Sequence, residues 1–394
     1  MPTLGMTGWA PVPRCDLCAP AVFSNVESSE MLEVSLHALS FSYGDSPFAI
    51  RGIDLICGKS LHTAITGPAG CGSSTLLRLI GGDLRPDAGE VRIGNRVVNR
   101  VSRARRPLLF ATDKLPFPGR WSVRHALVAA VRQRTLDRVD RQREFDLALT
   151  KWRIEPLAAR RIATLARSEQ TLVHLASIEL LRPGILVIDR LFAGMSPTLV
   201  RWAANEFYRT LRVMGATVIG APASTAELGW ADHMAILDRG VLIQAGRPAQ
   251  VFSAPLDDAA AIATGDVNII PIAIRGGTVD SLIGSWDLDP PPFQGAGVAL
   301  ARPDDFVIAQ KGEQSDLIFG VEEAMFDGGR WSVAGILSGG FLLRVDLPRH
   351  VAVQKGKLFA LRYDPSRFPL IPREIEPLQL SPPTDVVPPR RETR

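Results

Sequence analysis

The sequence predicts an α/β domain with a parallel sheet, followed by a smaller all-β domain. As far as about residue 264, short apolar runs alternate with segments that have the apolar spacing of helices. This alternation is typical of parallel strands joined by crossover helices. Beyond Gly265 the helical spacing ends, and short apolar runs separated by Gly, Pro and Asp follow, as in small barrels. A chain of 394 residues is long enough for two or three folded domains.

Residues 1–30 lack any periodicity, and we expect them to form a flexible N-terminal extension. Cys15 and Cys18 have the spacing of half a zinc site. Because no second cysteine pair and no nearby histidine accompany them, we interpret them as two thiols in that extension. No basic stretch followed by an apolar one begins the chain, so we do not expect a secretory signal. Four cysteines are too few for a disulfide framework and fit a reducing compartment.

The first domain is predicted to span residues 31–264. Its expected strands lie in "LEVSLHALSF", "IDLIC", "LHTAIT", "ILVIDR" and "ATVIGAP", and its expected hairpins in "GEVRIGNRVVN" and "MAILDRGVLIQAG". The segment "SSTLLRLIGG" has the spacing of a helix that ends at Gly81 and Gly82. Residues from about 119 to 170 are helical in period and rich in arginine. They are expected to form a helical subdomain inserted into the sheet.

The second domain is predicted to span residues 265–375. Short strands are expected in "GVALARP", "FLLRVDLP" and "KLFALRYDP". Residues 376–394 are rich in proline and charge, so we expect a disordered tail.

A glycine-rich loop lies between an expected strand and an expected helix. Gly67, Gly70 and Gly72 are spaced so that backbone amides can wrap a polyphosphate at the start of the helix. Ser74 stands where a hydroxyl would bind magnesium, but Ser73 stands where such loops carry a lysine. A tight strand–helix turn is the structural alternative. The flanking strand and helix and the downstream run "ILVID" favour phosphate binding.

These motifs resemble the ATP-binding subunits of ABC transporters, in particular the importer subunits of the maltose, ferric-iron, polyamine and sulfate type. The resemblance runs from about Leu32 to about Pro372 and rests on "FSYGDSPFAIRGIDL", "GPAGCGSSTLLRLIGGDLRPDAGEVRIG", "ILVIDRLFAG", "ADHMAILDRGVLIQAGRPAQVFSAP", "GVALARPDDFVIA" and "LFALRYDPSRF". It implies a P-loop NTPase sheet with an inserted helical subdomain, followed by an OB-like regulatory barrel.

The resemblance also implies the ligands and the residues that hold them. In this family ATP and Mg²⁺ are bound, the aromatic ring at Tyr43 stacks on adenine, and Ser74 and Asp189 hold the metal. The nucleotide-binding residues implied in this chain are Tyr43, Gly67, Pro68, Ala69, Gly70, Cys71, Gly72, Ser73, Ser74, Thr75 and Asp189.

The departures from the family pattern fall on the residues of catalysis. Ser73 stands at the position of the loop lysine, and Ala111 at that of the glutamine that senses the γ-phosphate. Arg190 stands at the position of the catalytic glutamate, Ala223 at that of the switch histidine, and Ser196 at that of the D-loop aspartate. The signature pentapeptide aligns with Leu165–Glu169, where Arg167 and Ser168 replace two glycines. No catalytic residue is therefore expected, and Arg190 and Ala223 stand at lost catalytic positions.

Hydrolysis should suffer more than binding. A general base contributes roughly a hundred- to ten-thousand-fold in rate, and arginine cannot accept a proton near neutral pH. The missing lysine removes a charged hydrogen bond worth about 1.5–3 kcal/mol, but the backbone amides remain. If the side chain of Arg190 reaches the phosphates, it restores part of this attraction. The alternative is that Arg190 faces its own sheet edge or a neighbouring carboxylate.

The partners implied by the resemblance are transmembrane permease subunits and a second ATP-binding subunit, identical or different. The chain would then lie in the cytoplasm, peripheral on the inner face of the cell membrane. A groove for a permease helix would need Trp121, Val123, Leu127 and Trp152, but these residues could equally form the core of the helical subdomain. Acidic residues interleave with the arginines of this segment, so we do not expect it to bind nucleic acid.

We therefore expect an importer ATP-binding subunit whose hydrolysis is impaired or absent. One alternative is a slow but functional ATPase of the same family. The other is a pseudo-ATPase scaffold or sensor that drives no transport.

Overall fold

The computed structural model describes residues 32–44, 49–310, 312–337 and 340–373. The chain divides into two compact units, residues 1–249 and 250–394. The expected N-terminal extension with Cys15 and Cys18, and the expected tail from residue 376 onward, lie outside the described residues. In the part of the chain that is described, no helix combines the length and the apolar character needed to cross a membrane.

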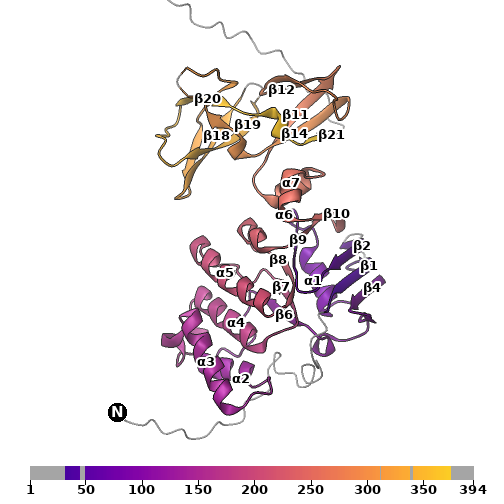
Figure 1. The fold of residues 1–394 in the computed structure, drawn as a ribbon, viewed down its shortest axis with the longest axis vertical. Helices are drawn as coiled ribbons and strands as arrows, with labels where there is room; N and C mark the ends of the chain where they lie inside the picture. Colours follow the sequence, from indigo (N-terminus) through magenta and orange to yellow (C-terminus); the bar gives the residue numbers. More distant parts are fainter. Residues whose placement is uncertain (1–31, 45–48, 311, 338–339, 374–394) are drawn as a thin grey trace, which may run out of the picture. The chain divides into compact units, whose positions relative to one another are not determined.

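The first unit is built on a six-stranded sheet with the order β10-β9-β3-β8-β7-β6 (Figure 1). Its first five strands in sequence are parallel, and β10 is antiparallel to β9. The inner strands are continuous apolar runs because helices or a second sheet cover both faces. The strands are β3 (His62–Thr66), β6 (Leu109–Thr112), β7 (Ile185–Asp189), β8 (Thr217–Ala221), β9 (His233–Asp238) and β10 (Val241–Gly246).

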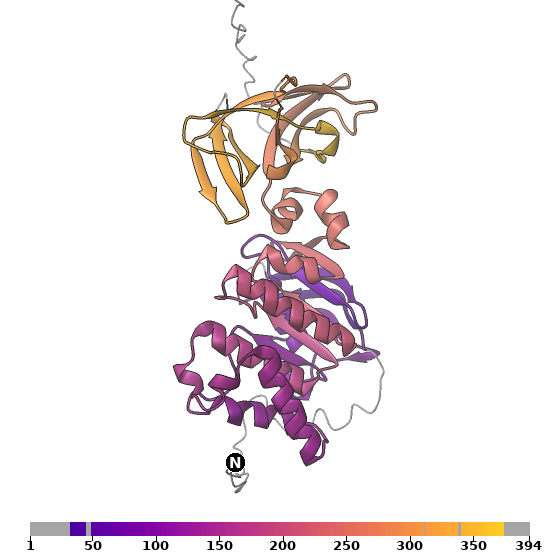
Figure 2. The ribbon, with the colours of Figure 1, turned by 60° about the vertical axis from the view of Figure 1, so that its left-hand side comes forward.

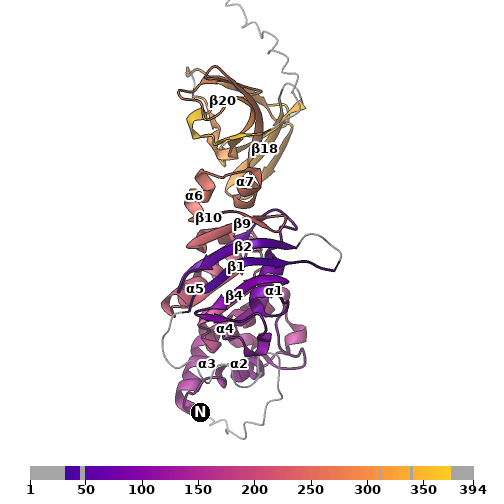
Figure 3. The same ribbon diagram turned by 90° about the vertical axis from the view of Figure 1, so that its right-hand side faces the viewer.

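A second, antiparallel sheet has the order β2-β1-β4-β5. Figure 3 shows β1, β2 and β4 side by side. Apolar side chains of this sheet, of helix α1 (Ser73–Gly81) and of β7 and β8 form one core, so α1 is buried between the two sheets. The strands are β1 (Val34–Phe41), β2 (Ile50–Cys57), β4 (Ala88–Ile93) and β5 (Arg96–Val97).

The helical subdomain is inserted between β6 and β7, as expected. It contains α2 (Val123–Val131), α3 (Arg138–Trp152) and α4 (Arg167–Leu181), which gather at one end of the unit in Figure 2. The 3₁₀ turns η3 (Glu155–Leu157) and η4 (Ile162–Thr164) connect α3 to α4. Further along the chain, α5 (Pro197–Val213) joins β7 to β8.

The four apolar residues that an open partner groove would need are all in the core. Trp121 is 5% exposed, and Val123, Leu127 and Trp152 are fully buried. Their side chains pack in apolar cores of the first unit, and Trp152 also contacts Trp202 and Phe207 of α5. Of the two readings of these residues, the structure supports the subdomain core and excludes the open groove.

The second unit begins at residue 250, earlier than the boundary expected at residue 264. The reason is that helix α7 (Asp258–Thr264) packs with this unit, since Ala261 contacts Val298 and Leu300 in a common apolar cluster. Helix α6 (Pro248–Ser253) spans the division.

The rest of the second unit consists of β-strands in three sheets, of five, three and three strands, around a shared apolar core. It is the separate all-β unit that the sequence predicts, and its likeness to an OB barrel stays a prediction. The strands are β11 (Asn268–Arg275), β12 (Thr278–Ser281), β13 (Gly284–Asp287), β14 (Gly295–Ala301), β15 (Val307–Ile308), β16 (Leu317–Gly320), β17 (Glu323–Phe326), β18 (Arg330–Ile336), β19 (Leu342–Pro348), β20 (Leu358–Arg362) and β21 (Leu370–Pro372).

Candidate functional site

The glycine-rich loop runs from the end of β3 into α1. Gly72 caps the helix with φ +103°, a left-handed conformation that suits glycine. At Gly67 a Cβ atom would lie 1.9 Å from the carbonyl oxygen of Leu237, so no side chain fits there. The amide of Gly240 donates to the carbonyl of Cys71 over 2.9 Å and ties the loop to the turn between β9 and β10. The loop is therefore shaped by the strands around it.

A cavity of about 400 Å³, here called the phosphate cavity, opens over this loop. Its other wall is formed by Arg190 after β7 and by Ala221, Pro222 and Ala223 at the end of β8. The carboxyl ends of parallel strands meet at one edge of a sheet, and so these chain segments converge there. The loop residues that line the cavity are Gly67, Pro68, Ala69, Gly70, Cys71, Gly72, Ser73, Ser74 and Thr75, the nine loop positions expected from the sequence.

A second cavity of about 760 Å³ adjoins the first and shares three lining residues with it, Gly70, Gly72 and Thr75. Tyr43 lines this second cavity, not the phosphate cavity. Its ring meets Phe41 edge-on at 4.8 Å, and its hydroxyl lies 3.2 Å from the hydroxyl of Thr75. The ring is 44% exposed and so is open to a stacking partner.

Ser74 and Asp189 lie together, as expected for a metal site. The hydroxyl of Ser74 donates to Oδ1 of Asp189 over 2.9 Å. A hydroxyl and a carboxylate are hard oxygen ligands of the kind Mg²⁺ prefers, with phosphate oxygens and water completing its shell. No cluster of three or more His, Cys, Asp or Glu side chains that could hold a metal occurs among the described residues. This pair therefore fits a metal that arrives with a phosphate ligand, not a protein-only cage.

Arg190 is anchored by its backbone and free at its side chain. Its amide donates to the carbonyl of Ala221 over 2.9 Å, and its φ is +52°. The residue is exposed and lines the phosphate cavity. Within the described parts of the chain, its guanidinium has no hydrogen-bond or ion-pair partner. The alternative in which Arg190 pairs with a neighbouring carboxylate is therefore wrong.

Ala223 also lines the cavity, with only a methyl group to present. Its amide and that of Ser224 donate to Oε1 of Glu227, over 2.8 and 3.1 Å. Glu227 is 2% exposed, and its burial raises the pKa of its carboxyl group to about 7. Sequence reasoning missed Glu227, although Ser224 followed three residues later by Glu227 is a capping-box pattern.

The other positions of departure do not line the phosphate cavity. Ala111 is buried in β6, and Ser196 precedes α5 as its N-cap. Arg167, in the first turn of α4, forms an ion pair with Asp113, which follows β6. These residues do not contribute to the walls of the cavity.

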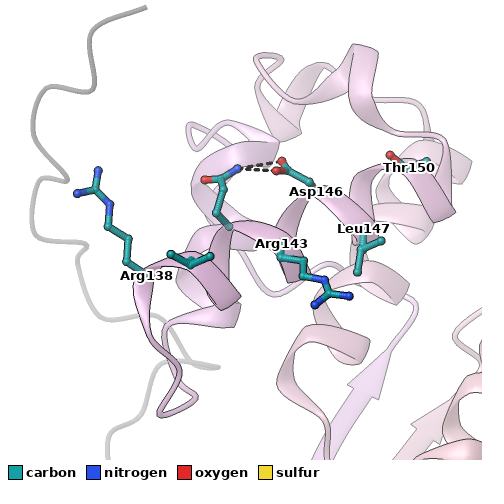
Figure 4. Close-up of a pocket in the computed structure, with 7 residues that line it drawn as sticks. Arg138, Arg143, Asp146, Leu147 and Thr150 are labelled. Atoms are coloured by element: carbon teal, nitrogen blue, oxygen red, sulfur yellow. Dashed lines mark hydrogen bonds between the residues drawn. The ribbon is translucent and has the colours of Figure 1, made fainter.

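The outer face of α3 carries a hollow of about 640 Å³ (Figure 4). Gln142 donates to both carboxylate oxygens of Asp146 over 2.9 and 3.0 Å, and Val139 and Leu147 are exposed beside them. All of its lining residues belong to one helix, and it has no loop of converging amides. The sequence-predicted site residues lie elsewhere, over the glycine-rich loop.

Comparison with known proteins agrees with this geometry. A family model described as ABC transporter matches residues 50–193. Similar relatives include the sn-glycerol-3-phosphate import ATP-binding protein UgpC of Roseobacter denitrificans, 27% identical over 79% of this chain and 87% of the relative. The Fe(3+) ions import ATP-binding protein FbpC of Mesorhizobium japonicum is 28% identical over 74% of this chain and 84% of the relative.

Solved structures support the fold. An ATP-binding cassette of an ABC transporter, MJ1267 in its ADP conformation, matches with a TM-score of 0.50 and 22% identity, over 59% of this chain and 99% of that one. Similarly, cbiO1 from Clostridium perfringens matches with a TM-score of 0.50 and 23% identity, over 56% and 90%. This chain therefore carries an ABC transporter domain with the fold of an ATP-binding cassette.

Proposed function

We propose that this protein is the ATP-binding subunit of an ABC importer and that it binds ATP with Mg²⁺ but hydrolyses it slowly or not at all. The names of its relatives support the importer role, since they are import ATP-binding proteins. One observation is the main support for the proposed loss of ATP hydrolysis. Among the described residues, the lining of the phosphate cavity includes Arg190 and no Asp, Glu or His side chain.

Binding is supported by what the site retains. The loop keeps its backbone amides just before α1 starts at Ser73, and the positive end of a helix favours an anion there. Ser74 and Asp189 remain within 2.9 Å of each other, in position to hold Mg²⁺. The metal would supply positive charge to the phosphate oxygens. Tyr43 offers a ring for the base in the adjoining cavity.

Hydrolysis needs a group that takes a proton from water or orients it. Arg190 has no acceptor, and Ala223 has only a methyl group. Asp189 accepts a hydrogen bond from the hydroxyl of Ser74, so this carboxylate is engaged in the candidate metal site. Losing the base alone removes roughly a hundred- to ten-thousand-fold in rate. An isolated subunit would then turn over far below the usual range of about 1–1,000 per second.

The importer role implies partners. In such a role the subunit would bind a transmembrane permease and a second ATP-binding subunit, identical or different, on the inner face of the cell membrane. The structurally similar cbiO1 is described as part of the ABC transporter complex cbiONQ, which is consistent with this arrangement. An active sister subunit would supply the hydrolysis that this chain lacks.

The test is calorimetric binding of magnesium-ATP together with steady-state phosphate release, on the same purified preparation. We expect saturable binding and phosphate release no faster than that of a Ser74→Ala, Asp189→Asn double variant. Magnesium-dependent release well above that variant would identify a slow ATPase instead. Failure to bind ATP at all would leave a scaffold that does not use the nucleotide.

A further inference from the structure

The phosphate cavity contains one cation, and that cation is not in the loop. Among the described residues that line the cavity, Arg190 is the only charged one. The loop itself carries Ser73 and Ser74 at the start of α1, with no basic side chain from Gly67 to Thr75. The positive charge of this site therefore comes from the opposite wall, at the end of β7.

The backbone of Arg190 is held in place. Its amide donates to Ala221, its carbonyl accepts from the amide of Ala193 over 3.0 Å, and β7 pairs with strands on both sides. Its left-handed backbone is one that L residues rarely adopt. Two other arginines near the site have carboxylate partners, since Arg167 pairs with Asp113 and Arg239, in the second cavity, lies 3.9 Å from Asp238. Arg190 keeps an unengaged guanidinium at the cavity wall instead.

The arrangement of the two adjoining cavities determines which end of a bound nucleotide lies near Arg190. The second cavity has an apolar part that suits a base, and the residues shared by both cavities lie at the loop. The apolar part is lined by Tyr43, Ala49, Val241 and Ile243, and the charged residues Arg51, Asp238 and Arg239 also line this cavity. A nucleotide whose base occupies the second cavity therefore passes its phosphates over the loop into the first cavity. The phosphate farthest from the base then lies nearest the wall that carries Arg190.

We propose that Arg190 binds the terminal phosphate of ATP, so that this site distinguishes ATP from ADP without cleaving either. This proposal rests on the proposed ATP-binding function. A guanidinium suits the role because its planar fork donates two parallel hydrogen bonds to phosphate oxygens and stays charged at all physiological pH values. The same side chain cannot act as a base, so tight binding and lack of turnover have one cause.

The experiment is isothermal titration of ATP and ADP, each with Mg²⁺, into the full chain and its variants. Arg190→Gly removes the guanidinium and also suits the left-handed backbone, so we expect this variant to fold. It should lose roughly ten- to a hundredfold in ATP affinity, the effect of one charged hydrogen-bonding group. Its ADP affinity should change by less than about threefold, and Arg190→Lys should recover part of the loss.

Arg153→Gly is the matched control. Arg153 is also exposed, with φ +55°, but it lies at the end of α3 and not in the phosphate cavity. We expect its nucleotide affinities to equal those of the parent. Equal losses for ATP and ADP in Arg190→Gly, or no loss, would overturn the proposal while leaving ATP binding itself intact. A parent chain that binds neither nucleotide would instead refute the proposed function.

Discussion

At the residue scale, the shape of the loop depends on Gly67 more than on Gly70. A Cβ at Gly67 would collide with the Leu237 carbonyl at 1.9 Å, whereas a Cβ at Gly70 meets nothing within 4 Å. Gly67→Ala should therefore displace the loop and lower ATP affinity more than about tenfold. Gly70→Ala should cost only the strain of its φ of +82°, about 1–2 kcal/mol of folding free energy. Chemical denaturation and calorimetry on both variants check this contrast, and similar ATP affinities for the two would refute it.

A substitution at Ser73 should change ATP affinity without changing the rate of ATP hydrolysis. Ser73→Lys places a cation in the loop, and we expect ATP affinity to rise by about tenfold, the lower end for a charged hydrogen bond. Phosphate release should not rise, because Arg190 still offers no proton acceptor. Filter binding and a phosphate-release assay measure the two quantities. A Ser73→Lys variant with brisk turnover would show that the lost lysine, not the lost base, limits the enzyme.

The positions of the candidate site residues could largely be predicted from the sequence, because loop, strand and helix are contiguous in the chain. The nine loop residues, Ser74 with Asp189, and Tyr43 all lie where the motif predicts. The side of the sheet to which the Arg190 side chain points could not be predicted. It depends on a left-handed backbone and on which carboxylates lie nearby in space. Glu227 was missed because its burial comes from tertiary packing.

At the element scale, a buried arginine caps the C-terminal end of helix α1. Arg106 is 1% exposed and donates to the carbonyls of Leu79 and Ile80 in the last turn of α1, and also to those of Val98 and Val101. Its charge complements the negative end of the helix whose other end faces the cavity. Arg106→Met leaves these carbonyls without donors, and we expect the free energy of unfolding to fall by at least about 3 kcal/mol.

Arg103→Met serves as the control for this loss, measured by urea denaturation. Arg103 is exposed and pairs with Asp83 at 3.0 Å, an interaction worth about 0.2–1 kcal/mol at a surface. If both variants lost the same stability, the buried contacts of Arg106 would not be what secures α1.

The turn after β8 should respond to pH through Glu227. Burial raises the pKa of Glu227 from 4.5 to about 7, so the folded protein holds this proton more tightly than the unfolded chain does. Between pH 4.5 and 7 the folded state thus binds more protons, and its free energy of unfolding falls as pH rises. The shift corresponds to about 3 kcal/mol across that window.

Glu227→Gln removes the titration and keeps an acceptor for the amides of Ala223 and Ser224. We expect the stability difference between parent and variant to shift by about 3 kcal/mol from pH 4.5 to 7, with the variant gaining. Glu169→Gln, whose side chain accepts from the amide of Ala166 at a more exposed helix start, is the comparison. A difference that is flat across these pH values would show that Glu227 is ionised without cost.

Among the elements, α1 and the strands that form clear apolar runs, such as β3, β7 and β8, were predicted close to their observed ends, because apolar runs and glycines mark them. Strands such as β6 and β11 were not predicted. α1 ends at Gly81 with Gly82 as its cap, and β9 and β10 meet at Arg239 and Gly240. The partner of an apolar helix face could not be predicted in the same way. An apolar stripe that packs inside its own chain has the same pattern as one that binds another protein, and Trp152 is of the first kind.

At the scale of the whole molecule, the candidate nucleotide site belongs to the first unit. Every residue that lines the two cavities lies between Tyr43 and Ile243, ahead of the division after Ala249. The composition shift near residue 265 places the boundary too late because α7 is helical yet packs with the β-strands that follow. The composition of a segment indicates whether it forms a helix or a strand, whereas the boundary between the two units depends on tertiary contacts.

A chain that ends after Leu256, between α6 and α7, should therefore keep its nucleotide site. We expect its affinity for magnesium-ATP to remain within about threefold of the full chain, since no lining residue is lost. Calorimetry on both chains measures this. A loss beyond about tenfold would mean that the second unit contributes to the site.

The most direct test of the whole account follows the fate of one bound nucleotide. ATP labelled at its terminal phosphate is bound to the protein alone with Mg²⁺, the free nucleotide is removed, and the label is identified after incubation. We predict that the label leaves the protein as intact ATP. Label recovered as inorganic phosphate, at a rate that depends on Mg²⁺ and is abolished by Asp189→Asn, would contradict the claim that this cassette captures ATP without splitting it.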